Sequence, residues 1–236
     1  MSWSKLPSVP TLYRSVAAAA VLGLTCLWLP TVAQAATAPQ VRFVTTQGDF
    51  TVEMYPDKAP KTVANFLQYV KDKHYDGTVF HRVISSFMVQ GGGYDAQYTE
   101  KPTRAPVVHE GREALEKGGA KNVEGTLAMA RTNEPNSASS QFFINVNDNA
   151  FLNPTLIPPG DPVPEFSFQG QTYKDTPRAK LLGAAQLYGY TVFGKVVSGM
   201  DVINKIKVTP TGAGGPFAAD VPKTQVVIKS ATLTKP

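Results

Sequence analysis

Few residues in this chain could carry covalent or metal chemistry. The three histidines, His74, His81 and His109, do not show the spacing of zinc or iron ligands. No G-x-S-x-G segment provides a nucleophile for hydrolysis, and Ser139 and Ser140 fall in a polar turn. These patterns predict no metal site and leave hydrolysis as a weak candidate.

Arg82 draws attention because it interrupts FHRVISSFMVQGGG, a run that otherwise reads as buried strand. A buried charge is costly unless it is paired. Strand alternation places Arg82 on the face opposite His81 and Val83. Arg82 is therefore either a structural ion-pair partner or a charged donor at a site, whereas His81 is expected to be a packed core histidine with a hydrogen-bonded ring.

A second apolar and aromatic segment covers residues 125–153. Phe142 and Phe143 alternate on a predicted strand, so one should enter the core while the other faces outward. An apolar recognition pocket would explain an outward phenylalanine. The glycines at 91–93 are not followed by the Lys-Ser or Lys-Thr of a phosphate loop, and we interpret them as a turn that leaves such a pocket open.

The first 35 residues differ in character from the rest of the chain. Lys5 and Arg14 precede or border an apolar stretch over residues 16–29, and Ala33-Gln34-Ala35 matches a signal-peptidase site. We expect a signal peptide over residues 1–35, cleaved after Ala35. An uncleaved anchor is the alternative, but about 14 apolar residues fall short of the roughly 20 that span a bilayer. No stable membrane insertion is expected after cleavage.

Composition limits the function of the remaining chain. Cys26 is the only cysteine and lies in the predicted signal peptide, so disulfides, thiol catalysis and cysteine metal sites are excluded from the mature chain. Removing Lys5 and Arg14 from the 23 Lys and Arg residues leaves 21 against 18 Asp and Glu residues. So small an excess, without a basic run, argues against nucleic-acid binding.

The remaining 201 residues, 36–236, read as one mainly β domain. A hairpin around Gly48 should place Phe50, Val52 and Met54 on one face, and residues 60–70 have the spacing of an amphipathic helix. A short helix is expected over residues 200–206. Further strands are predicted at residues 79–84, 88–90, 126–130, 141–146, 191–197 and 225–233. Many short strands with two core helices favour an antiparallel sheet closed into a barrel and capped by the helices.

Residues 153–189 interrupt this rhythm and read as an insertion. Their first part contains five prolines and is expected to be an extended loop. A short helix should follow, with Thr176 as its N-cap and Pro177 in its first turn. We favour a tolerated surface elaboration over a functional lid or partner surface.

Several motifs follow one another in a recognisable order. They are F-H-R-V-I, F-M-x-Q-G-G, G-x-x-A-M-A-R, S-Q-F-F-I-N-V, N-x-F-L and Y-x-V-F-G-K-V-x-x-G-M-D-V. In these motifs the chain resembles the cyclophilins, which are peptidyl-prolyl cis-trans isomerases, and especially their exported bacterial members. The resemblance covers residues 40–233 apart from the insertion. It implies a closed eight-stranded antiparallel barrel capped by two α-helices.

The resemblance also implies the site residues. The family's catalytic arginine falls on Arg82, and no cofactor or metal is expected. Its substrate-binding positions fall on Phe87, Met88, Gln90, Ala130, Arg131, Thr132, Gln141, Phe143, Phe151, Leu152 and Tyr190. Phe151 and Tyr190 stand where many members have tryptophan and histidine, Arg131 replaces a common asparagine, and Ser85-Ser86 replaces a common Pro-Gly.

The expected function is rotation about X-Pro peptide bonds during the folding of exported proteins. The expected partners are proline-containing peptides and unfolded exported proteins, bound by a monomer in the periplasm. A thylakoid lumen or secretion would also suit the signal. Two alternatives remain open: a module that binds proline-containing segments without useful catalysis, and a holdase chaperone.

Overall fold

The computed structural model describes residues 38–234, so the predicted signal peptide lies outside the described residues. Among these residues no helix has the length and apolar character to cross a membrane.

The main element is an eight-stranded antiparallel sheet with the order β12-β1-β2-β9-β5-β6-β4-β3. Its strands are β1 (Gln40–Thr45), β2 (Gly48–Met54), β3 (Thr78–Ile84), β4 (Met88–Asp95), β5 (Thr126–Met129), β6 (Phe142–Asn145), β9 (Val192–Ser198) and β12 (Ile228–Thr234). The predicted mainly β fold and strand count are confirmed. All six strand regions and the first hairpin that the sequence predicts appear in this sheet, with shifts of a few residues at some ends.

Closure of the sheet into a barrel is partial. The two outer strands, β3 and β12, meet at an isolated bridge between Val79 and Val227. Two backbone hydrogen bonds reinforce this edge: Gly77 N donates to Ile228 O at 2.8 Å, and Phe80 N donates to Val226 O at 2.9 Å. The two edges are thus joined over a short stretch rather than along their full length.

The core inside the sheet is aromatic. Phe43 stacks on Phe50 at 4.8 Å, and Phe142 meets Phe66 edge-on at 5.7 Å. Phe50, Val52 and Met54 are all buried, as the alternation of their strand predicts. Such packing of large rings from strands and helix gives one rigid scaffold for the opposite face of the sheet.

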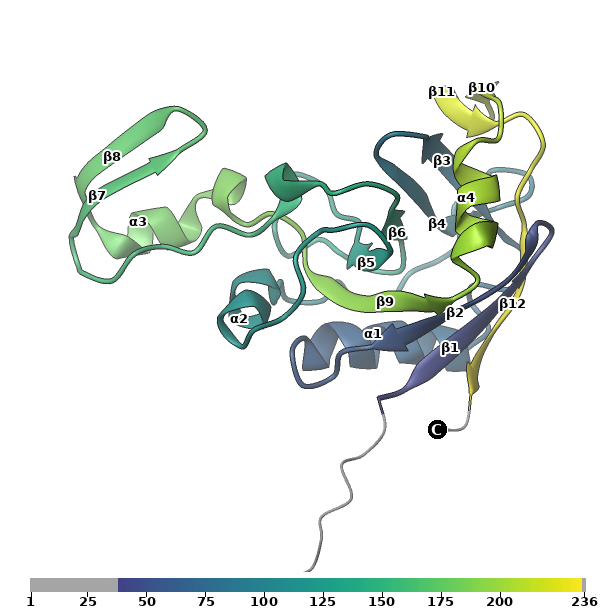
Figure 1. Ribbon diagram of the computed structural model, residues 1–236, viewed down its shortest axis with the longest axis horizontal. Coiled ribbons are helices and arrows are strands. Elements are labelled where there is room, and N and C mark those ends of the chain that lie inside the picture. Colours follow the sequence, from purple (N-terminus) through teal and green to yellow (C-terminus); the bar gives the residue numbers. More distant parts are fainter. Residues whose placement is uncertain (1–37, 235–236) are drawn as a thin grey trace, which may run out of the picture. The chain divides into compact units, whose positions relative to one another are not determined.

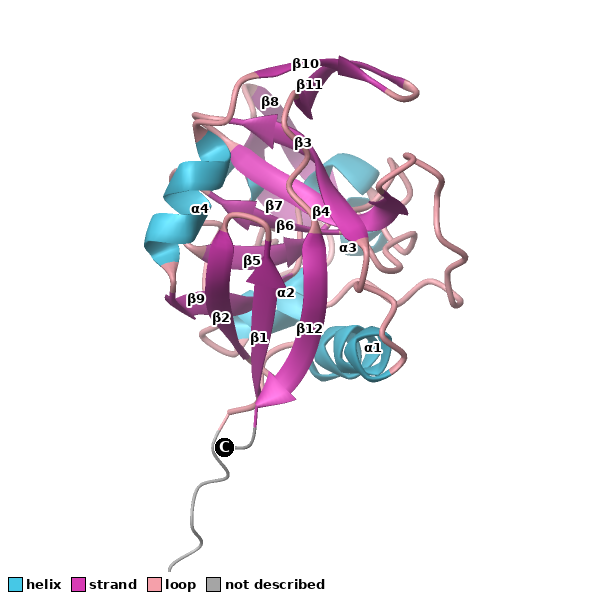
Figure 2. Ribbon diagram, turned by 90° about the vertical axis from the view of Figure 1, so that its right-hand side faces the viewer, coloured by secondary structure: helices cyan, strands magenta, loops and turns pink. Residues whose placement is uncertain are grey.

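Two helices cover this core, as predicted. Helix α1 (Pro60–Lys71) contacts β12, and α4 (Met200–Lys207) contacts β2, β3 and β4 (Figure 2). No side chain of its own caps the start of α1. Instead the buried Glu110 accepts hydrogen bonds from Thr62 N at 2.8 Å and Lys61 N at 3.1 Å. A carboxylate at this end also complements the helix dipole. Glu110 immediately precedes α2 (Gly111–Glu116), which the sequence analysis missed.

The insertion is more ordered than expected. Strands β7 (Val163–Phe168) and β8 (Gln171–Thr176) form a hairpin, followed by α3 (Arg178–Gly183) (Figure 1). The predicted extended loop is therefore wrong for residues 163–176. Thr176 ends β8, and Pro177 occupies the N-cap position of α3 without a side-chain cap. A small separate core explains this order, and it comprises Ile157, Val163, Phe166, Leu181 and Leu187.

A second hairpin was also not predicted. It joins β10 (Thr211–Gly214) to β11 (Phe217–Pro222), and β11 contacts β3 (Figure 1). Residues 210–222 contain three glycines and three prolines, a composition typical of a loop.

The glycines at 91–93 lie inside β4, so their interpretation as a turn is wrong. They permit close approach instead. A Cβ at Gly93 would lie 2.5 Å from the Cγ of Gln141, and Gly92 has φ +85° with the ring of Phe142 at 3.0 Å from its Cβ position. Glycine here lets neighbouring side chains pack directly against the strand.

Candidate active site

A single row of residues crosses four strands on the face away from the aromatic core. Arg82 of β3 pairs with Gln90 of β4, Gln90 pairs with Phe143 of β6, and Phe143 pairs with Ala128 of β5. Directly paired residues share a face of a sheet, and neighbouring strands lie about 4.8 Å apart. The strand register therefore brings Arg82, Gln90 and Phe143 into one row, although they come from distant parts of the chain.

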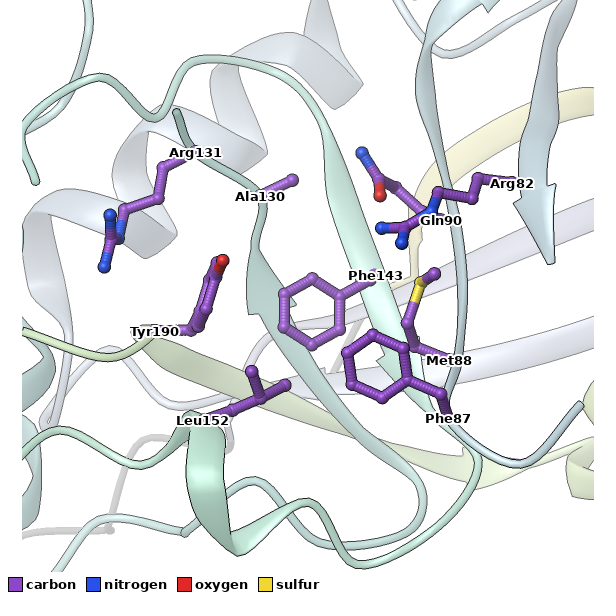
Figure 3. A pocket seen from close by; sticks show the side chains of 9 residues that line it. All are labelled: Arg82, Phe87, Met88, Gln90, Ala130, Arg131, Phe143, Leu152 and Tyr190. Carbon is purple, nitrogen blue, oxygen red and sulfur yellow. The ribbon is translucent and has the colours of Figure 1, made fainter. Parts of the chain in front are cut away.

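This row borders a pocket of about 180 Å³. Nine residues line it: Arg82, Phe87, Met88, Gln90, Ala130, Arg131, Phe143, Leu152 and Tyr190 (Figure 3). Every one of them belongs to the site set inferred from the sequence. Figure 3 shows apolar side chains on one side of the pocket and the Arg82 guanidinium on the other.

The pocket floor is a second apolar cluster, separate from the main core. Met88, Phe143 and Leu152 are 2%, 4% and 7% exposed. Phe142 and Phe143 do alternate faces, but both are buried, because Phe142 joins the main core and Phe143 the pocket floor. The phenylalanine expected to face outward is thus the base of a pocket just large enough for a small ring.

Three inferred residues lie outside this lining. Thr132 and Gln141 border an adjacent groove of about 290 Å³, which also contacts Gln90, Ala130 and Arg131. The amide of Gln90 donates to Oε1 of Gln141 at 3.0 Å, which links the groove to the pocket. Phe151 is 65% exposed and stacks on Phe87 with ring centroids 5.5 Å apart.

Arg82 satisfies part of both interpretations made from the sequence. Its side chain is 45% exposed, and its Nε lies 3.8 Å from Oδ2 of Asp220 on β11. An exposed ion pair of this length contributes little to stability, about 0.2–1 kcal/mol. The pair leaves the guanidinium at the pocket edge, so it orients the cation without burying it.

Arg131 and Tyr190 form the opposite wall. Arg131 Nε donates to Gly189 O at 2.9 Å, and its guanidinium carbon lies 4.9 Å from the centre of the Tyr190 ring. Tyr190 in turn meets Phe143 edge-on at 5.4 Å. The side chain of Arg131 therefore holds the wall in place, a role that the sequence analysis did not predict.

A network of buried asparagines supports the floor. Asn149 Nδ2 donates to Phe87 O at 2.9 Å and to Oδ1 of Asn145 at 2.7 Å. Asn122 Nδ2 donates to Leu152 O at 3.2 Å, and Asn145 Nδ2 donates to Oδ1 of Asn122 at 3.2 Å. The network ties the backbones of two pocket residues together through groups that cannot reach water.

Of the two histidines near the site, His81 is buried and His109 is half-buried, and neither is poised for proton transfer. Burial lowers the pKa of His81 to about 4, partly offset by the Val79 carbonyl, and its Nδ1 makes no hydrogen bond among residues 38–234. The expected core position is confirmed, but the expected hydrogen bond is not made at Nδ1. Burial, aided by the charge of Arg131, also lowers the pKa of His109 to about 4. Within the described chain, no cluster of three potential metal ligands occurs.

Sequence reasoning missed Asp220 and the hairpin that carries it. No local pattern marks this residue, because its partner Arg82 is far away along the chain. Asp220 has φ +64°, a left-handed conformation that aspartate adopts more readily than most residues. A non-glycine residue with positive φ becomes visible only in the folded structure.

Comparison with known proteins agrees with this geometry. Residues 40–233 match the family model described as "Cyclophilin type peptidyl-prolyl cis-trans isomerase/CLD". The chain belongs to the cyclophilin-type peptidyl-prolyl cis-trans isomerases, enzymes that interconvert the cis and trans forms of X-Pro peptide bonds.

Particular relatives are similar over nearly their full length. The chain is 43% identical to peptidyl-prolyl cis-trans isomerase B of Escherichia coli K12 over 195 residues, which cover 83% of this chain and 99% of that protein. It is 44% identical to the isomerase cyp18 of Streptomyces antibioticus over 193 residues, covering 82% and 97%. A crystal structure of a Cryptosporidium parvum cyclophilin shares the fold, with TM-score 0.58, 22% identity, and coverage of 84% and 99%.

Proposed function

We propose that Arg82 is the catalytic residue of this isomerase and that the nine-residue pocket binds the substrate proline. The barrier to be lowered arises from amide resonance and amounts to about 18–20 kcal/mol. At the twisted transition state conjugation is lost, and the prolyl nitrogen carries a basic lone pair. A guanidinium donor near that nitrogen stabilises the twisted state more than either planar state, which is the requirement for catalysis.

Arginine suits this role because it stays charged and presents a rigid planar set of donors. The ion pair with Asp220, 3.8 Å from Nε, restrains the guanidinium at the pocket edge. Restraint before the reaction lowers the reorganisation that the donor needs when the peptide bond twists.

The apolar floor would hold the pyrrolidine ring still. Met88, Phe143 and Leu152 are almost completely buried and form a fixed apolar floor, so a proline ring placed on them gains close apolar contacts. Gln90 is held by its hydrogen bond to Gln141 and pairs with Arg82, and in this proposal it would bind the peptide backbone. With the ring held on one side, the residue before proline is free to rotate.

The single observation that carries this proposal is the register-aligned row of Arg82, Gln90 and Phe143 beside an apolar pocket. The test is a coupled isomerase assay on an Ala-Pro peptide with the Arg82→Ala variant. We expect most activity to be lost while the fold is retained.

We further propose that the enzyme is exported and acts on unfolded proteins in the periplasm as a monomer. The support is the charged, apolar and Ala-x-Ala pattern of residues 1–35 and the absence of cysteine from residues 36–236. Mass spectrometry of the protein purified from fractionated cells tests this point. A mature chain beginning at Ala36 in the periplasmic fraction is expected, and an uncleaved cytoplasmic chain would refute it.

A further inference from the structure

A second cavity lies on the other side of Arg82 from the proline pocket. Its volume is about 480 Å³, and it is bounded by β3, β4, Gln141 immediately before β6, and the β10–β11 hairpin. The side chains that matter here are Arg82, Gln90, Tyr94, Gln141 and Phe217. The hairpin forms one wall of this cavity, so the cavity exists only because residues 211–222 fold back against β3.

The wall of the cavity is aromatic and rigid. The ring of Phe217 stacks on His81 at 5.3 Å with an interplanar angle of 27°, and it meets Tyr94 edge-on at 5.0 Å. His81 is 3% exposed and, because burial lowers its pKa to about 4, it is uncharged at neutral pH. An uncharged stack of this kind presents apolar surface to whatever occupies the cavity.

The mouth of the cavity is open and carries little net charge. Ala218 and Ala219 are exposed, and their small side chains do not close the entrance. The only charged residues of the lining, Arg82 and Asp220, face each other at 3.8 Å. Gln90 and Gln141 add amide groups. This combination favours a large uncharged side chain over an acidic or basic one.

The cavity adjoins the proposed active site. Arg82 and Gln90 line both cavities and are directly paired across β3 and β4. An extended peptide advances about 3.3–3.6 Å per residue. A peptide with its proline in the first pocket therefore reaches the second cavity within about three residues.

We propose that this cavity is a second substrate subsite, which binds an aromatic side chain located within about three residues of the target proline. The inference rests on the proposed active site at Arg82 and deepens it by naming a preferred substrate class. The β10–β11 hairpin then acts as a specificity element of the isomerase.

The test measures kcat/KM by NMR exchange on a host peptide, Ala-Ala-Ala-Pro-Ala-Ala-Ala, and on variants with tyrosine at each of the six alanine positions. We expect tyrosine at one position to raise kcat/KM by about 3- to 10-fold, as an aromatic contact would give. Phe217→Ala should reduce this ratio to about one. Ala219→Trp, which fills the cavity from an exposed position, should do the same without removing a packed ring.

The matched control is Phe168→Ala. Phe168 is a half-buried phenylalanine on the other surface hairpin, away from the cavity, and its removal should leave the tyrosine preference unchanged. If Phe217→Ala proves unstable in thermal unfolding, Ala219→Trp decides the question. A preference that survives Ala219→Trp would overturn the proposal.

Failure of this inference and failure of the proposed active site give different results. If the parent enzyme turns over every peptide equally, and Arg82→Ala loses most turnover of the host peptide, the subsite is refuted and the catalytic role of Arg82 stands. If Arg82→Ala retains full turnover of the host peptide, the active-site assignment fails, and the subsite fails with it.

Discussion

Asn149 offers a sharp test of how the pocket is supported. It is 2% exposed, and its amide donates to Phe87 O at 2.9 Å and to Oδ1 of Asn145 at 2.7 Å. In Asn149→Ala both bonds are lost. Phe87 O still accepts from Val146 N at 3.1 Å, so the Oδ1 of Asn145 is the acceptor left without this donor.

The free energy of unfolding should fall by about 2–3 kcal/mol. The loss comes from the hydrogen bond to Phe87 O, which keeps a second donor, and from the buried Oδ1 of Asn145, which loses this donor. Because the network also reaches the backbone of Leu152, both the floor and the side of the pocket loosen. We therefore expect kcat/KM to fall by about tenfold, with a larger change in KM than in kcat. Urea unfolding and steady-state isomerase kinetics measure the two effects.

Asn147→Ala is the matched control. Asn147 lies two residues away and donates to Ser86 O at 3.3 Å, but this bond is exposed. We expect a change within about 0.5 kcal/mol and unaltered kinetics. The reasoning is refuted if the two variants lose similar amounts of stability, or if Asn149→Ala keeps the parent's stability.

Three further predictions concern stability, the floor and the insertion. Because the pKa values of His81 and His109 are lowered to about 4 in the fold, the unfolded chain binds more protons below pH 6.5. The free energy of unfolding should be at its full value above pH 6.5 and fall toward pH 4, by on the order of 3 kcal/mol for each histidine. Urea titrations at several pH values should show a weaker pH dependence of this free energy for His109→Gln than for the parent. Phe143→Leu should raise KM for proline peptides severalfold, because a branched chain cannot reproduce the flat floor; an unchanged KM contradicts that role. Deleting residues 155–186 should leave Ala-Pro turnover within about twofold, since Thr155 N bonds to Leu187 O at 3.0 Å and the ends of the insertion already meet. A large loss of turnover would indicate a functional lid.

Much of the scaffold could be predicted because it depends on local periodicity. The alternation of Phe50, Val52 and Met54 correctly predicted that they are buried. The spacing of Val63, Phe66 and Val70 correctly predicted the buried face of α1. The position of Arg82 on the exposed face of β3 followed from the same alternation. The family motifs added which of these positions gather at the pocket.

The missed features depend on contacts between distant residues. Glu110 caps α1 from 48 residues beyond Thr62, and Asp220 reaches Arg82 from the end of the chain. The hairpin of β10 and β11 is rich in glycine and proline, so its strands become visible only through their pairing and their contact with β3. The order of the insertion likewise comes from its own small core, which no periodic pattern revealed.

The central claim is that the Arg82 guanidinium stabilises the twisted X-Pro bond. The most direct measurement is kcat/KM of Arg82→Ala on an Ala-Pro peptide, with thermal unfolding of the same sample. We predict a loss of at least about 100-fold, as for removal of one transition-state donor, and a change in stability below about 1 kcal/mol, since only an exposed ion pair is lost. Undiminished turnover by a folded Arg82→Ala enzyme would contradict the account.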